Sequence, residues 1–161
     1  MRENTGSKYN QNLSTKEIAV AIREDIKAAV KAGTIPAAKI SVRTRHFAGG
    51  SAIDIEVVRV PEGVILITDE YVKHTLGPDR NHVFHGERHT PEAKKLVVTL
   101  KAISDAYNYD NSDAMTDHFD VNFYGHVQID WELESRQEKA IAAKLTPALP
   151  EDLKALLQSF N

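Results

Sequence analysis

Three groups of polar residues in this 161-residue chain could do chemistry, and the first is a run of histidines. His82, His85 and His89 lie close together in the sequence, and imidazole is the commonest protein ligand for transition metals. If a loop brought their nitrogens together, the three could hold zinc or a similar divalent ion. Such spacings fix no geometry in a loop, so exposed loop histidines are the alternative interpretation.

The second group is acidic, and four aspartates and a histidine make it up: Asp110, Asp113, Asp117, Asp120 and His118. Grouped carboxylates can bind magnesium or calcium for phosphoryl chemistry. The spacing is not that of an EF-hand, because no glycine occupies its sharp-turn position. Asp110 and Asp113 can equally be turn and cap residues whose oxygens accept backbone N–H groups, and we favour this structural interpretation.

The third group is basic and predicts a surface that binds nucleic-acid phosphates: Lys39, Arg43, Arg45, His46 and Arg59. The planar donors of arginine suit phosphate. Cross-strand pairing of the arginines with Asp54 and Glu56 is the alternative that we favour by a narrow margin, and it would cancel much of the positive field.

Weaker signals accompany these groups. Gly49-Gly50-Ser51 could cradle a phosphate, although a double glycine between strands is usually a turn. Five aromatic residues could stack on bases, namely Phe47, Tyr107, Tyr109, Tyr124 and Trp131; for Trp131 we expect burial instead. The sequence holds no Ser-His-Asp order, P-loop or dinucleotide fingerprint, which favours a protein that is not an enzyme.

Composition sets further bounds. Hydrophobic residues make up 42% of the chain and charged residues 27%, so we expect a globular domain rather than disorder. Without cysteine there can be no disulfide or thiolate zinc site. A net charge of -3 provides no overall basic field. We find no membrane-spanning run and no signal peptide, which predicts a cytoplasmic protein without a membrane partner.

The best-defined element is a helix over residues 14–32. Ser14 and Glu17 have the spacing of a capping box, in which each side chain satisfies the other residue's free backbone N–H. An apolar stripe follows with helical spacing, and Gly33 can close the helix in the left-handed conformation. Residues 1–12 are polar and predict a flexible leader.

Strand patterns follow this helix. Apolar residues alternate over 40–43 and 53–57 on either side of the glycine pair, which predicts an antiparallel hairpin. Val64–Ile67 suits a third strand. Residues 69–89 are the least regular stretch, and a second helix opens at Thr90-Pro91.

From Phe119 to Trp131 the apolar residues all have odd numbers. An uninterrupted strand keeps them on one face, and so does a hairpin with the three-residue loop Tyr124-Gly125-His126. We favour the hairpin, because glycine weakens the middle of a strand.

Together these elements predict an α+β fold. We expect a single two-layer domain over 13–131, with an antiparallel sheet of hairpins packed against two helices, and a helical C-terminal tail over 132–161.

Two stretches of the sequence resemble a large polyvalent protein-associated domain family of phages and conjugative elements. The first is SVRTRHFAGGSAIDI at 41–55, after the capped helix start; the second is YNYDNSD at 107–113 with FDVNFYG at 119–125. Ala52 departs from the serine that the family more often has. The resemblance implies a mobile-element origin and a small α+β module, often embedded in larger proteins, and it implies no catalytic residues.

Three functions are consistent with these observations. We favour a non-enzymatic accessory module of a mobile element that binds nucleic acid or a nucleic-acid-processing protein. The second is a metal-dependent hydrolase or nuclease that uses the aspartate or histidine group. The third is a protein-binding inhibitor of host defence, with an acidic surface around 110–120. The oligomeric state is not predicted.

Overall fold

The computed structural model describes residues 4–113, 115–116, 119–148, 151 and 154, and it has the expected α+β class. The chain forms two compact units, each built from two segments of sequence. Unit 1 comprises residues 1–62 and 95–130, and unit 2 comprises residues 63–94 and 131–161. Within the range 13–131, residues 63–94 and residue 131 fall in unit 2, together with the C-terminal segment.

Unit 1 begins with the helix that the sequence predicts, α1 (Thr15–Lys31). Ser14 and Glu17 form the capping box, with the Ser14 N–H donating to Glu17 Oε2 over 2.8 Å. Beyond the helix, Gly33 has a φ of 72°, and the Thr34 N–H donates to the Ala29 carbonyl. Both ends of the helix are thus fixed by local chemistry, as predicted.

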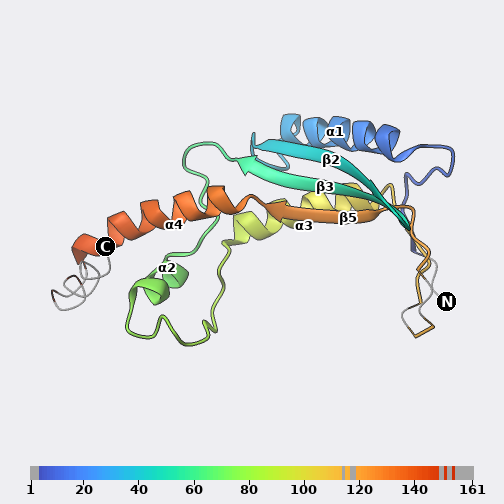
Figure 1. The fold of residues 1–161 in the computed structure, drawn as a ribbon. Coiled ribbons are helices and arrows are strands. Elements are labelled where there is room, and N and C mark those ends of the chain that lie inside the picture. Colours follow the sequence, from blue (N-terminus) through green and yellow to red (C-terminus); the bar gives the residue numbers. More distant parts are fainter. Residues whose placement is uncertain (1–3, 114, 117–118, 149–150, 152–153, 155–161) are drawn as a thin grey trace. The chain divides into compact units, whose positions relative to one another are not determined.

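The hairpin is also confirmed, as β2 (Lys39–Phe47) and β3 (Gly50–Arg59). Its turn is short, and Gly49 takes a φ of 101° that residues with a side chain rarely adopt. Figure 1 shows α1 lying along this hairpin.

The prediction of a second hairpin is wrong. Tyr124-Gly125-His126 is not a loop but the start of an uninterrupted strand, β5 (Tyr124–Ile129). This strand pairs with β3 in the parallel sense, so the sheet order is β2-β3-β5 and the sheet is mixed rather than antiparallel. The two strands are joined through α3 (Pro91–Asp105), a long connection of the kind that parallel strands need.

Gly125 is the second residue of β5, and a helix lies close to it. A Cβ atom at this position would lie 3.2 Å from the Ser104 hydroxyl of α3 and 3.5 Å from the Phe123 ring. Ser104 and Phe123 are both almost fully buried. The glycine that weakens a strand by propensity here relieves a tight contact with α3.

The core of unit 1 lies between the helices and one face of the sheet. Its buried residues come from α1, from the strands and from the part of α3 that belongs to this unit: Ile18, Ile22, Ile26, Val42, Ile53, Ile55, Val57, Leu96 and Leu100. On the sheet these are the residues that alternate with polar ones, as the strand pattern predicts.

Residues 4–12, part of the predicted leader, make contacts within unit 1. β1 (Asn4–Thr5) pairs with β4 (Tyr109–Asp110), and the Tyr9 and Tyr109 rings stack with centroids 5.5 Å apart. Lys8 forms a 2.5 Å ion pair with Asp25 of α1. Burial raises the pKa of Asp25, but hydrogen bonds from Lys8 and Tyr107 outweigh it and leave the pKa below its ordinary value.

Unit 2 is built around α2 (Asp69–Leu76) and α4 (Trp131–Leu145), with a short 3-10 turn at Thr146–Ala148. Ile67, Val72 and Ile141 form its buried cluster. The helix predicted from residue 132 is present as α4, and residues 149–150, 152–153 and 155–161 of the predicted tail lie outside the described residues. α2 lies inside the stretch expected to be irregular.

Two other expectations in unit 2 are wrong. Val64–Ile67 is not a full strand, because only an isolated bridge joins Ile67 to His89. Trp131 is not buried: it begins α4 rather than ending a strand, and 72% of it is exposed. The odd-numbered pattern thus ends at Ile129.

Replacing Gly125 with valine should lower the free energy of unfolding by about 1–3 kcal/mol, because the added methyl groups overpack the contact with Ser104. The loss should shrink in a Ser104→Ala background, which removes the atom that the new side chain meets. Urea denaturation of the single and double variants measures both values. Equal losses in the two backgrounds would contradict this account of Gly125.

Candidate nucleic-acid interface

The two faces of the unit 1 sheet differ in chemistry because of the strand register. Val42, Ile55 and Val127 lie side by side across the three strands and belong to the apolar face. One residue further along, Arg43, Asp54 and His126 are aligned on the opposite face. We call that face the polar face and define it by Arg43, Arg45, Asp54, Glu56, His126 and Gln128, all of which line one open hollow.

Both arginines of the polar face are paired with carboxylates of β3. Arg45 donates from Nε to Asp54 Oδ2 over 2.5 Å and from Nη2 to Oδ1 over 3.0 Å. Arg43 donates from Nη2 to Glu56 Oε2, and the Gln128 amide donates to the other oxygen, Oε1, over 2.9 Å. The cross-strand pairing that the sequence offered as an alternative is therefore present.

These pairs fix the charge state of the face. Hydrogen bonds from Arg45 lower the pKa of Asp54 below its ordinary value, although burial opposes them, and the positive charge of Arg45 adds to the effect. The same hydrogen bonds raise the pKa of Arg45. Asp54 is thus ionised at neutral pH, and the two arginine charges are balanced by two carboxylates.

The carboxylates lie deeper in the face than the arginines. The side chains of Arg43 and Arg45 are 64% and 59% exposed, whereas those of Glu56 and Asp54 are 14% and 24% exposed. A guanidinium carries five N–H donors. Among the described residues, Asp54 accepts from Nε and Nη2 of Arg45 but not from Nη1, and Glu56 accepts from Nη2 of Arg43. The carboxylates therefore orient the arginines and leave donors for a ligand.

Two aromatic rings adjoin this face at the hairpin turn. The Phe47 and Tyr124 centroids are 5.8 Å apart with the ring planes at 40°, and with Arg45 and His126 they line a second open hollow. A Cβ atom on Gly50 would lie 3.3 Å from the Tyr124 ring and 3.8 Å from the Phe47 ring. Glycine at this position gives both rings room over the end of the hairpin.

The structure thus brings together only part of the predicted basic group. Arg43 and Arg45 share the polar face, whereas His46 alternates onto the opposite side of β2. Lys39 and Arg59 are register partners at the far end of the hairpin, about 13 Å from Arg43 by strand rise.

Sequence reasoning missed two members of the polar face, His126 and Gln128. The favoured loop at 124–126 removed them from the sheet, although the alternative of an uninterrupted strand would have found them. The alternation of Tyr124, His126 and Gln128 with apolar residues was the available signal.

The predicted histidine site is not assembled. Within the described part of the chain, no group of three or more His, Asp or Glu residues could hold a metal ion. His82 instead lies 3.4 Å from Asp79, and His89 contacts Glu134. His85 is exposed.

The described aspartates of the acidic group accept hydrogen bonds within the fold, as the structural interpretation expects. Asp110 and Asp113 accept backbone N–H groups two residues ahead, from Ser112 and Met115, over 2.9 Å each. Asp120 accepts from the Tyr109 hydroxyl over 3.2 Å. Asp117 and His118 lie outside the described residues.

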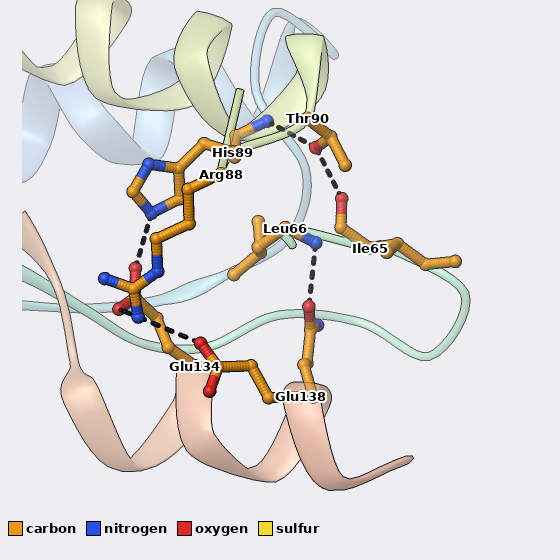
Figure 2. Close-up of polar contacts among 9 residues, drawn as sticks. Ile65, Leu66, Arg88, His89, Thr90, Glu134 and Glu138 are labelled. Atoms are coloured by element: carbon orange, nitrogen blue, oxygen red, sulfur yellow. Dashed lines mark hydrogen bonds and ion pairs between the residues drawn. The ribbon is translucent and has the colours of Figure 1, made fainter. Parts of the chain in front are cut away.

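Unit 2 contains a polar cluster that no sequence motif indicated. Figure 2 shows Arg88 and His89 directed at the carboxylates of α4. Glu134, which is 8% exposed, accepts from Arg88 over 2.7 Å and contacts His89 Nε2 over 2.6 Å, and Glu138 accepts from Arg88 over 3.0 Å. Burial works to lower the pKa of Arg88, but the hydrogen bond to Glu138 and the charge of Glu134 raise it.

The cluster continues through Gln137 to the segment before α2. Gln137 accepts from the Leu66 N–H over 2.7 Å and donates to the Val64 carbonyl over 2.8 Å, as a neighbouring strand would. On the other side, Leu66 and Ile65 carbonyls accept from Thr90, and Figure 2 shows the contact at Ile65. These bonds satisfy backbone N–H and C=O groups of residues 64–66, which belong to no sheet. We therefore assign the cluster a structural role.

Comparison with known proteins identifies no relative of this chain. No family model matches the sequence. Neither the curated proteins nor the solved structures contain a match. The resemblance to the polyvalent protein-associated family therefore rests on the two stretches quoted above. Among the described helices, none has the length and apolar character that crossing a membrane requires.

Asp54→Asn should change how stability depends on pH. Because the pKa of Asp54 lies below its ordinary value of 3.8, its carboxylate adds stability that is present above that pH and is lost as the pH falls through the lower pKa of the folded state. We expect the variant to have a lower Tm at neutral pH and a shallower decline below about pH 4. Glu62→Gln, at an exposed acid, is the control, and declines of equal slope in all three proteins would contradict the assignment.

Gln137→Leu should destabilise unit 2, because it leaves the Leu66 N–H and the Val64 carbonyl without their partner. We expect the free energy of unfolding to fall by about 1–3 kcal/mol, since both hydrogen bonds are partly buried. Lys139→Leu, on the same helix but exposed, is the matched control. Urea denaturation in which both variants lose the same stability would argue against the strand-like role of Gln137.

Proposed function

We propose that this chain is a non-enzymatic binding module for nucleic acid and that the polar face of unit 1 is its contact surface. The observation that carries the proposal is the pair of exposed, carboxylate-oriented arginines beside two aromatic rings on one face of the sheet. Guanidinium donors suit phosphate and base edges, and aromatic rings suit base faces.

The electrostatics favour a local and modest interaction. The chain carries a net charge of -3, and the two arginines are balanced by Asp54 and Glu56. Affinity that depends on releasing counterions from many phosphates needs several unbalanced cations. The polar face therefore suits directed hydrogen bonds and stacking better than a long electrostatic contact.

The resemblance to the polyvalent protein-associated family supports a mobile-element origin, in which such a module would act in the cytoplasm on nucleic acid or beside a nucleic-acid-processing protein. The hydrolase hypothesis gains no support from the described His and Asp residues, because they are not assembled into a metal-binding group. No described contact favours the inhibitor hypothesis.

Arg43→Gln/Arg45→Gln should weaken binding to a fluorescein-labelled oligonucleotide at least tenfold in an anisotropy titration at low salt. Glutamine removes both charges and most donors and can still contact Asp54 and Glu56. The control is Lys16→Gln/Lys31→Gln, which removes the same charge from exposed positions of α1. If the wild type fails to bind DNA and RNA at low salt, or if both double variants lose affinity equally, the proposed surface is wrong.

A further inference from the structure

We infer that the hollow lined by Arg45, Phe47, Tyr124 and His126 binds one unpaired nucleobase, so that the ligand of this module is single-stranded nucleic acid. This inference rests on the proposed function, since it specifies the ligand of the same face. We call these four residues the base site.

The lining of the base site is chemically uniform. All four side chains are flat π-systems: two aromatic rings, an imidazole and a guanidinium. Planar groups of this kind stack on bases, and the cation adds attraction to the electron-rich face of a ring. A duplex would offer this site only its backbone and groove edges, because its base faces are already stacked on one another.

The site is held in place before any ligand arrives. Arg45 is fixed by two hydrogen bonds to Asp54, and the Phe47 and Tyr124 rings contact each other over Gly50. Ala52, the register partner of both Arg45 and Tyr124, is fully buried beneath the site and forms a rigid floor. Side chains fixed in this way lose little conformational entropy on binding.

The Phe47 ring is exposed and the Tyr124 side chain is partly exposed, so both can meet a ligand from solvent. Phe47 is 46% exposed although it stands at the end of a strand whose apolar residues face the helices. Its neighbour across the sheet is a tyrosine, a residue that combines a stacking surface with a hydroxyl. A solvated sheet face needs neither, whereas a base site uses both.

The charge balance at the base site favours a base rather than a bare phosphate as the ligand. The Arg45 charge is balanced by Asp54, so this guanidinium adds no excess positive charge that would attract an isolated phosphate. Stacking does not need that excess. The ligand should therefore be recognised mainly through its base, with the available Nη1 donors of Arg45 directed to a base edge or to the adjoining phosphate.

The test compares three fluorescein-labelled ligands of equal length in anisotropy titrations with the whole chain: a ten-nucleotide single strand, a strand in which every base is replaced by an abasic site, and a duplex. We expect the single strand to bind at least tenfold more tightly than either of the others, since only its bases are free to stack on the rings. Equal affinity for the single and abasic strands would overturn the base site and leave phosphate binding by the polar face intact. Equal affinity for the duplex would overturn it as well.

Substitutions of the two aromatic residues test whether their rings cause the preference for the single strand. Tyr124→Leu and Phe47→Leu keep apolar bulk and should each weaken single-strand binding about tenfold while leaving the abasic strand unaffected. Trp131→Leu, at an exposed aromatic residue of unit 2, should change neither. If Tyr124→Leu and Phe47→Leu both bind the single strand as tightly as the wild type does, the base site is wrong. If the wild type binds none of the three ligands, both the base site and the proposed function fail.

Discussion

The parallel pairing of β5 with β3 is the constraint on which the candidate site depends. It aligns Asp54 with His126 and Glu56 with Gln128, and it brings Tyr124 beside the turn of the β2–β3 hairpin. Without β5 the hairpin would present two salt bridges and one exposed phenylalanine. Gly125 favours this pairing, because a Cβ atom there would lie only 3.2 Å from the Ser104 hydroxyl of α3 and would crowd the contact.

The ion pairs of the polar face determine what kind of binding surface it can be. Surface pairs of this type contribute little to stability when both partners are solvated. Here the carboxylates are recessed and the guanidinium groups are exposed, so the pairs serve to orient donors. They also remove the net charge that a typical phosphate-binding groove relies on. A surface with oriented donors, two rings and no excess charge is suited to selective contact with bases rather than to strong attraction of any polyanion.

Local signals in the sequence were sufficient for the elements that local chemistry determines. The capping box at Ser14 and Glu17 and the glycine turn at Gly49 each specify an element through neighbouring residues, and α1 and the hairpin were predicted correctly. Arg43 and Arg45 could be placed on one strand face for the same reason. The two possible fates of these arginines, pairing or phosphate binding, could not be separated, because the answer depends on how far Asp54 and Glu56 are recessed.

The errors arose where tertiary contacts override propensity. Gly125 indicated a turn by its intrinsic preference, but its lack of a side chain serves the approach of Ser104. Val64–Ile67 has the composition of a strand, yet its backbone groups are satisfied on one side by the side chain of Gln137, more than seventy residues later in the chain. Such long-range partners leave no trace in the local pattern. The histidines were grouped by sequence proximity alone, whereas in the structure His89 contacts Glu134 of α4.

The most direct test of the central claim is to map the contact surface by NMR, with a single-stranded oligonucleotide added to ¹⁵N-labelled protein. We expect the largest shifts at the Nε–Hε group of Arg45 and at the backbone amides of Phe47, Tyr124 and His126, while α1 and α4 change little. Shifts confined to α1 or to unit 2, with the polar face unperturbed, would contradict this claim.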